Sequence, residues 1–253
     1  LFSLSATKAS QKKMFYRGEG THFSNGTEFS EEVDSQSRNN RSAMMWSATM
    51  FVSRLLMPPP THRFCLDDGV GADSGFQYLS KILKIAKESE ADVRLFIQPT
   101  HAYLLEVLNI LGMMKYYEKW RHQLVDLVEG INKQYPKNPE LSLWDFSGYN
   151  SVNMDEVPSL EEPNSSMDWY YDVGHFKKSL GDMIQDRVFG YSDKERDVPI
   201  DFGVQINSKN IDLYHRTQRN KQTQYILAHQ EDIKELADKV DLINKKIRQF
   251  DCG

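Results

Sequence analysis

The chain has 253 residues, of which 40% are hydrophobic and 11% aromatic, so it is long enough to bury a core and does not have a disordered protein's composition. Its 31 basic and 36 acidic residues give a net charge of -5, which disfavours a nucleic-acid partner because no general positive field attracts one. The most apolar stretch, Met44 to Met57, is 14 residues long and contains Ser and Arg, so we expect no membrane span in this chain.

The first third of the chain is predicted to hold an irregular arm followed by the start of a folded domain. Residues 1–43 are rich in Ser, Asn, Lys and Glu and are interrupted by glycines, which predicts an exposed N-terminal arm. The apolar pattern from Ser42 to Leu56 predicts a buried helix that Pro58 to Pro60 end. A short strand over His62 to Leu66 and a helix with apolar positions from Phe76 to Ala86 are expected next.

A second strand, loop and helix follow with a clearer pattern. Val93 to Ile97 is short, β-branched and aromatic, which predicts a strand. Thr100 is expected to cap a helix that runs from Ala102 to Leu111. A third helix over Tyr116 to Ile131 and a strand over Leu141 to Phe146 complete this part.

Strands that alternate with helices indicate an α/β fold. We expect three α/β/α layers with a mainly parallel, flavodoxin-like sheet over residues 44–210. Such sheets bind ligands at the carboxyl ends of their strands, which points to the loops Gln98 to His101 and Asp145 to Asn150. Residues 211–253 are predicted to form a C-terminal amphipathic helix, whose apolar positions recur in steps of three and four over about three heptads: Ile226, His229, Ile233, Leu236, Val240, Ile243 and Ile247.

Asp172 and His175 form the most chemically suggestive pair in the sequence, at the entrance to a predicted helix. A carboxylate three residues before a histidine reaches Nδ1, selects the tautomer and leaves Nε2 to take a proton from a hydroxyl group. This arrangement is the base half of a catalytic triad. The alternative interpretation is a helix cap beside a surface histidine.

Five short segments occur in a shared order: Leu1 to Leu4, Leu95 to His101, Trp144 to Asn150, Tyr171 to His175 and Asp186 to Gly190. In this order they resemble the SGNH (GDSL-like) hydrolase and acyltransferase superfamily, and within it uncharacterised bacterial SGNH-like proteins. The resemblance extends from Leu1 to about Val204 and does not include the heptad tail. It implies an SGNH-type fold, a Ser-His-Asp mechanism on a small-molecule or cell-surface glycan ester, and a location outside the cytoplasm, in a bacterial cell envelope.

By this resemblance Asp172 orients His175, and His175 activates a serine. The superfamily carries that serine in a Gly-Asp-Ser or Gly-Ser-Ser segment at the end of the first strand, and this chain has no such segment there. Ser74 imitates it, but a long loop precedes this residue and an alanine interrupts the motif. We expect the nucleophile strand to lie before Leu1, so that this chain carries only the Asp-His part, lacks the domain's first strand and is inactive alone.

The candidates for substrate binding follow the two predicted strands: Thr100, His101, Asp145, Ser147 and Asn150. Thr100 and His101 lie where helix N–H groups point outward and bind an acyl oxygen or a sugar hydroxyl, or they simply cap the helix with a half-buried histidine. The other three are expected to line the same crevice, with turn formation as the alternative for Asp145. The aromatic run Trp169 to Tyr171 either stacks on a sugar or packs in the core or a loop.

Metal and cofactor chemistry have no support in the sequence. The seven histidines include no H-x-x-x-H pair, and Cys65 and Cys252 form neither a disulfide framework nor a metal cluster. Phosphate-loop and dinucleotide motifs are absent from the sequence, so we expect no cofactor and no metal.

A competing interpretation makes the protein a non-catalytic interaction module. In this view the SGNH-like scaffold is retained, and residues 221–253 serve in self-association or in docking to a partner.

Overall fold

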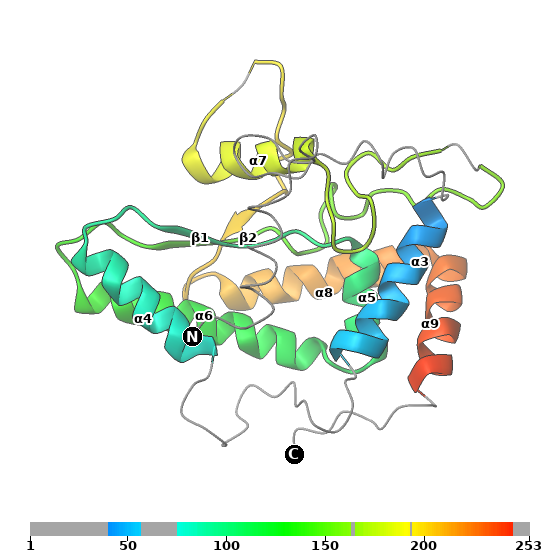
Figure 1. Ribbon diagram of the computed structural model, residues 1–253, viewed down its shortest axis with the longest axis horizontal. Helices are drawn as coiled ribbons and strands as arrows, with labels where there is room; N and C mark the ends of the chain where they lie inside the picture. The colour runs from blue at the N-terminus through cyan, green and yellow to red at the C-terminus, as the bar shows by residue number, and fades with distance from the viewer. Residues whose placement is uncertain (1–39, 57–74, 163–164, 193, 245–253) are drawn as a thin grey trace, which may run out of the picture. The chain divides into compact units, whose positions relative to one another are not determined.

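A computed structural model describes residues 40–56, 75–162, 165–192 and 194–244 (Figure 1). Several predictions lie outside these residues: almost all of the N-terminal arm, the strand over His62 to Leu66, the nucleophile candidate Ser74, and the end of the tail from residue 245.

Helices make up most of the described chain, and they agree with the sequence periodicity. They are α3 (Asn40–Met50), η1 (Phe51–Leu56), α4 (Gly75–Glu88), α5 (Ala102–Ile110), α6 (Met114–Gln134), α7 (Lys178–Phe189), α8 (Ile211–Ala228) and α9 (Gln230–Asn244). η1 is a π-helix that continues α3. Among the described helices, none is both long and apolar enough to cross a membrane.

Three short strands form one mixed sheet, so the predicted α/β class is confirmed. β1 (Arg94–Ile97) and β2 (Ser142–Asp145) are parallel, as predicted. β3 (Val204–Gln205) pairs with β2 in the antiparallel direction, and the strand order is β1-β2-β3. The sequence does not predict β3, because two residues are too few to show a strand pattern.

The strands lie between helices in Figure 1, with α7 on one side and α4, α6 and α8 on the other. On the α6 side, Ile97 and Leu143 share one hydrophobic cluster with Leu124 and Val128 of α6. On the α7 side, Arg94 of β1 donates from Nη1 to the carbonyl oxygen of Val188, at 2.8 Å.

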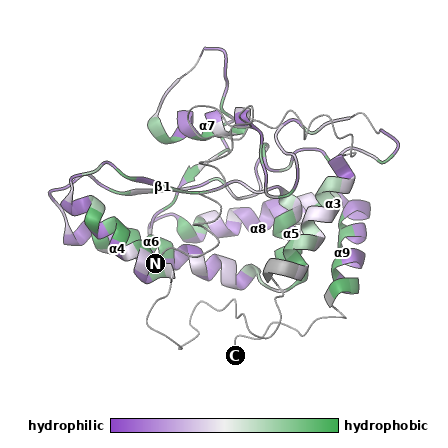
Figure 2. Ribbon diagram, in the orientation of Figure 1, coloured by the Kyte–Doolittle hydropathy of each residue, from purple (hydrophilic) through white to green (hydrophobic). Residues whose placement is uncertain are grey.

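A second hydrophobic cluster joins α3, α5, α7 and α9, and includes Ala48, Leu105, Leu180 and Leu236. Figure 2 shows that α5 is hydrophobic along much of its length, which fits a helix surrounded by other elements. Because α5 starts at the end of β1, this cluster ties the helices to the carboxyl edge of the sheet.

The predicted single C-terminal helix is two helices in the structure. Backbone angles at His229 (φ -122°, ψ 39°) are not helical, and α8 ends there. Leu236 and Val240 of α9 are fully buried, and α9 contacts α3 and α5. Arg41 of α3 also forms ion pairs with Asp232 and Glu235. Much of the apolar face that predicts a coiled coil is therefore covered by the chain itself.

Candidate functional site

The Asp172–His175 pair forms the tip of a small β-hairpin, in the last turn of chain before α7. Tyr170 and Phe176 are antiparallel bridge partners. The Tyr171 N–H donates to the His175 carbonyl at 2.9 Å, and the Lys177 N–H donates to the Trp169 carbonyl at 2.8 Å. α7 begins at Lys178, so the pair lies in a hairpin that leads directly into the helix.

Asp172 holds both the turn and the imidazole. Its Oδ1 accepts the backbone N–H groups of Gly174 and His175 at 2.8 and 2.9 Å. Its Oδ2 lies 2.7 Å from His175 Nδ1. A carboxylate at Nδ1 favours the tautomer that carries its proton there, which leaves the Nε2 lone pair free to accept a proton. The His175 side chain is 78% exposed, so Nε2 is accessible to a substrate.

Two neighbouring elements hold the hairpin tip. The Val173 carbonyl accepts the His101 backbone N–H at 3.1 Å, and the Val173 N–H donates to Ser47 Oγ at 3.3 Å. A Cβ at Gly174 would lie 3.2 Å from Cζ of Phe51, so the tip also packs closely on η1. The position of His175 is therefore set by the turn after β1 and by α3 with η1. Ser47 and Phe51 carry no signal in the sequence that indicates this role.

His101 is fully buried and caps α5, where the sequence predicts Thr100 as the cap. Its Nδ1 accepts the Tyr103 N–H at 3.1 Å, and its Nε2 lies 2.8 Å from the Asp155 carbonyl. Burial lowers the pKa of His101 to about 4, so the ring is neutral at pH 7. Its side chain is thus used inside the protein, where the ring packs edge to face on Tyr170 of the hairpin with 5.4 Å between centroids. Thr100 is 9% exposed, and its Oγ1 has no hydrogen-bond partner in the described part of the chain.

Asp145 and Ser147 belong to a buried polar network at the end of β2. Asp145 Oδ2 lies 2.7 Å from Nε of Arg121, and both side chains are at most 3% exposed. Ser147 Oγ donates to Asp145 Oδ1 at 2.6 Å and accepts from Arg121 and Tyr117. The Arg121 guanidinium also lies 4.1 Å from the Tyr117 ring centroid. Every member of this network is bonded to protein, which gives Asp145 a structural explanation that does not require a substrate.

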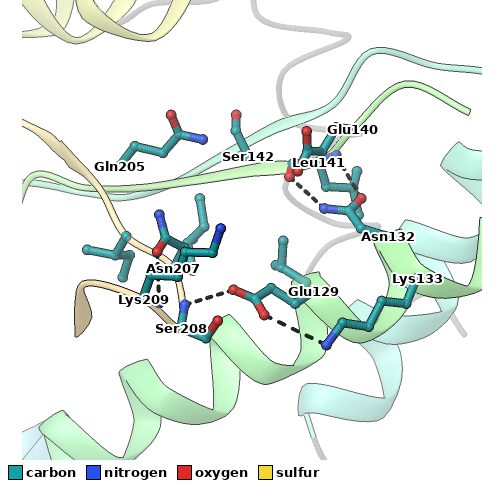
Figure 3. Close-up of a pocket in the computed structure, with 13 residues that line it drawn as sticks. Glu129, Asn132, Lys133, Glu140, Leu141, Ser142, Gln205, Asn207, Ser208 and Lys209 are labelled. Carbon is teal, nitrogen blue, oxygen red and sulfur yellow. Dashed lines mark hydrogen bonds and ion pairs between the residues drawn. The ribbon is translucent and has the colours of Figure 1, made fainter. Parts of the chain in front are cut away.

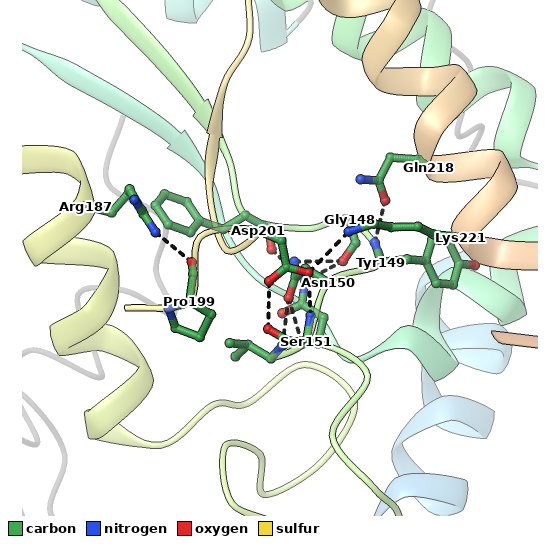
Figure 4. Close-up of polar contacts among 12 residues, drawn as sticks. Gly148, Tyr149, Asn150, Ser151, Arg187, Pro199, Asp201, Gln218 and Lys221 are labelled. Carbon is green, nitrogen blue, oxygen red and sulfur yellow. Dashed lines mark hydrogen bonds and ion pairs between the residues drawn. The ribbon is translucent and has the colours of Figure 1, made fainter. Parts of the chain in front are cut away.

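The loop after β2 is closed by its own asparagines. Asn150 Oδ1 accepts the Val152 and Asn153 N–H groups at 3.1 and 2.9 Å. Figure 4 shows this turn beside Asp201, which accepts from both the N–H and the hydroxyl of Ser151. Asn150 is 3% exposed, so it shapes the loop instead of facing the solvent.

Asn153 joins the three loops that carry the predicted site residues. Its backbone carbonyl accepts the Ala102 N–H at 2.8 Å, and its Nδ2 donates to the Phe146 carbonyl at 2.6 Å. Its Oδ1 accepts the Tyr170 hydroxyl at 2.6 Å. The sequence does not single out this fully buried residue, because a polar residue in a polar loop gives no local sign of distant contacts.

A cavity of about 340 Å³ lies elsewhere, between α6, the start of β2 and the segment that leads into α8 (Figure 3). Its polar wall is internally paired. Glu129 accepts the Ser208 N–H at 2.7 Å, and Asn132 bonds both the N–H and the carbonyl of Leu141 at 2.9 Å. None of the predicted site residues lines this cavity.

The chain matches no known family model, no curated protein and no solved structure. Within the described residues, no three His, Cys, Asp or Glu side chains are grouped to hold a metal ion.

Proposed function

We propose that this protein is the acid-base part of an SGNH-type esterase or O-acyltransferase that acts on a cell-surface glycan. The observation that carries the proposal is the contact of 2.7 Å between Asp172 Oδ2 and His175 Nδ1, with the imidazole exposed to solvent. Two backbone N–H groups hold the other carboxylate oxygen, so the orienting group is fixed before substrate arrives.

His175 moves one proton in each half of this reaction. A serine oxygen bonds to the acyl carbon while Nε2 takes the serine proton and then passes it to the departing sugar oxygen. Water or a second sugar hydroxyl then gives its proton to Nε2 and its oxygen to the acyl carbon, and Nε2 returns that proton to the serine oxygen as its bond to the acyl carbon breaks. The imidazolium formed in between is stabilised by Asp172.

The serine in this proposal comes from outside the described residues, on a strand that extends the sheet at β1. In the described chain β1 pairs only with β2, which leaves its second edge for another strand. A parallel strand there ends beside the turn that carries Thr100 and His101, and the His101 N–H contacts the hairpin. The buried Thr100 hydroxyl, which has no partner among the described residues, supports this arrangement, because an unsatisfied buried group costs about 1–3 kcal/mol until a partner arrives. The added strand would complete a three-layer SGNH-type domain.

The test is ester hydrolysis by the complete gene product, with ethyl acetate and partially O-acetylated oligosaccharides as substrates. We expect His175→Ala to lower kcat/KM by about 100-fold or more, because positioned bases contribute roughly that factor. Asp172→Asn should also lower it. His122→Ala is the matched control, since His122 is another histidine beside a carboxylate, with a side chain 41% exposed and 3.5 Å from Asp212. Unchanged turnover in His175→Ala would reject the proposal.

A second candidate function is a non-catalytic module that self-associates or docks through residues 221–253. It is favoured by Leu227 and Leu242, which are 63% and 60% exposed on α8 and α9. Deleting the tail is a poor test, because α9 covers the core. The double variant Leu227→Glu, Leu242→Glu is better, with molar mass measured by light scattering. A wild-type oligomer that becomes monomeric supports this function, and a monomeric wild type removes the self-association form.

A further inference from the structure

The hairpin register places three more side chains on the same face as His175. Residues 171 and 175 are opposed, as are residues 169 and 177, around the Tyr170–Phe176 bridge. Directly opposed residues share one face of a hairpin, and successive residues alternate between faces. Trp169, Tyr171 and Lys177 therefore lie on the His175 face, and of the two aromatic rings Trp169 packs against a hydrophobic cluster whereas Tyr171 does not. Tyr170 is fully buried and Phe176 packs on the core, so the other face of the hairpin points inward.

Tyr171 is held in place as a partly exposed ring next to the imidazole. Its backbone N–H donates to the His175 carbonyl at 2.9 Å. The Lys177 ammonium lies 5.7 Å from the centroid of the ring, and the same ammonium donates to the Met167 carbonyl at 2.8 Å. The Tyr171 ring is not part of either hydrophobic cluster of the described residues. These contacts orient the ring without burying it, which is the arrangement that a binding surface requires.

We propose that Tyr171 is a substrate-binding residue, whose ring stacks against the sugar that carries the ester. This inference rests on the proposed function and names its substrate class, an O-acylated glycan. The apolar C–H face of a pyranose matches the flat face of an aromatic ring, while the phenol hydroxyl remains available to water or to a sugar hydroxyl. Opposed residues have Cβ atoms about 5 Å apart, so a sugar on this ring places an attached ester within reach of His175 Nε2.

The experiment compares kcat/KM for partially O-acetylated chitotetraose, xylotetraose and mannotetraose with kcat/KM for ethyl acetate, which has no ring. In Tyr171→Ala we expect the ratio of tetraose to ethyl acetate activity to fall about tenfold for the best tetraose. Tyr171→Trp should restore the ratio, because it keeps an aromatic face. Tyr191→Ala is the matched control, since Tyr191 is 63% exposed and lies outside the hairpin. An unchanged ratio in Tyr171→Ala would overturn the inference.

A binding measurement separates failure of the inference from failure of the proposed function. The unacetylated tetraoses are titrated into the complete gene product carrying His175→Ala, and binding is followed by NMR. Binding that persists in His175→Ala and is lost on adding Tyr171→Ala supports the role of Tyr171, whatever the catalytic result. Binding of none of the three tetraoses, or equal binding with and without the tyrosine ring, overturns it. Loss of turnover in His175→Ala would still support the catalytic proposal in that case.

Discussion

The ion pair between Arg121 and Asp145 is expected to stabilise the fold and not to bind substrate, and its removal tests that distinction. Both side chains are at most 3% exposed and lie 2.7 Å apart. Asp145→Asn leaves the Arg121 charge buried without a counter-charge, and removing one partner of a buried pair typically costs about 3–5 kcal/mol. For a domain of this size that corresponds to a fall of about 10 °C in Tm.

Urea denaturation followed by circular dichroism measures the free energy of unfolding for Asp145→Asn, Arg121→Met and the double variant. We expect the double variant to lose about 1–3 kcal/mol less than the sum of the two single losses, because its two uncharged side chains no longer leave a buried charge alone. The control is the pair Lys178 and Asp182, whose side chains are 78% and 31% exposed; its removal should change stability by less than about 0.5 kcal/mol. A loss below 1 kcal/mol in Asp145→Asn, together with a raised KM, would refute this reasoning.

The remaining predictions concern His101 and two glycines. Because burial lowers the pKa of His101 from 6.5 to about 4, the unfolded chain binds its proton first as the pH falls, and stability is lost between those values. The free energy of unfolding of wild type should therefore exceed that of His101→Asn by about 3 kcal/mol less at pH 4 than at pH 7.5. Urea titrations of both proteins at each pH measure this difference. A difference that stays constant with pH would contradict a buried neutral ring. Gly203 has φ +83°, and an added Cβ would overlap the Phe146 ring, so Gly203→Ala should lower the free energy of unfolding by at least about 2 kcal/mol. Gly130→Ala in α6 meets nothing within 4 Å and should stabilise by about 0.5–1 kcal/mol; equal effects of the two substitutions in denaturant titrations would contradict both arguments.

The catalytic and binding candidates illustrate how far local sequence reasoning extends. Asp172 and His175 are three residues apart, so their contact depends only on a short stretch of chain. The structure contains this contact. The surroundings of Asp145 depend on Arg121, 24 positions earlier, and no local pattern shows that this arginine lies beneath the sheet. The same spacing rule that correctly pairs Asp172 with His175 therefore says nothing about whether Asp145 meets solvent.

The C-terminal heptad pattern has the same limitation. The periodicity correctly indicates an apolar helical face, which is a property of adjacent turns. The periodicity does not show whether another chain or the same chain packs against that face. Here α3 and α5 cover the apolar face of α9, and the helix break at His229 turns α9 toward those two helices.

Amino-acid order alone determined most of the helices, the positions of β1 and β2 along the chain and the carboxylate–imidazole contact, because each depends on neighbours within a few residues. Only the tertiary structure decided which polar groups are buried, how the two-residue strand β3 pairs and what holds the hairpin tip. Those outcomes depend on contacts such as Ser47 with Val173, between residues 126 positions apart, which form only when the chain folds.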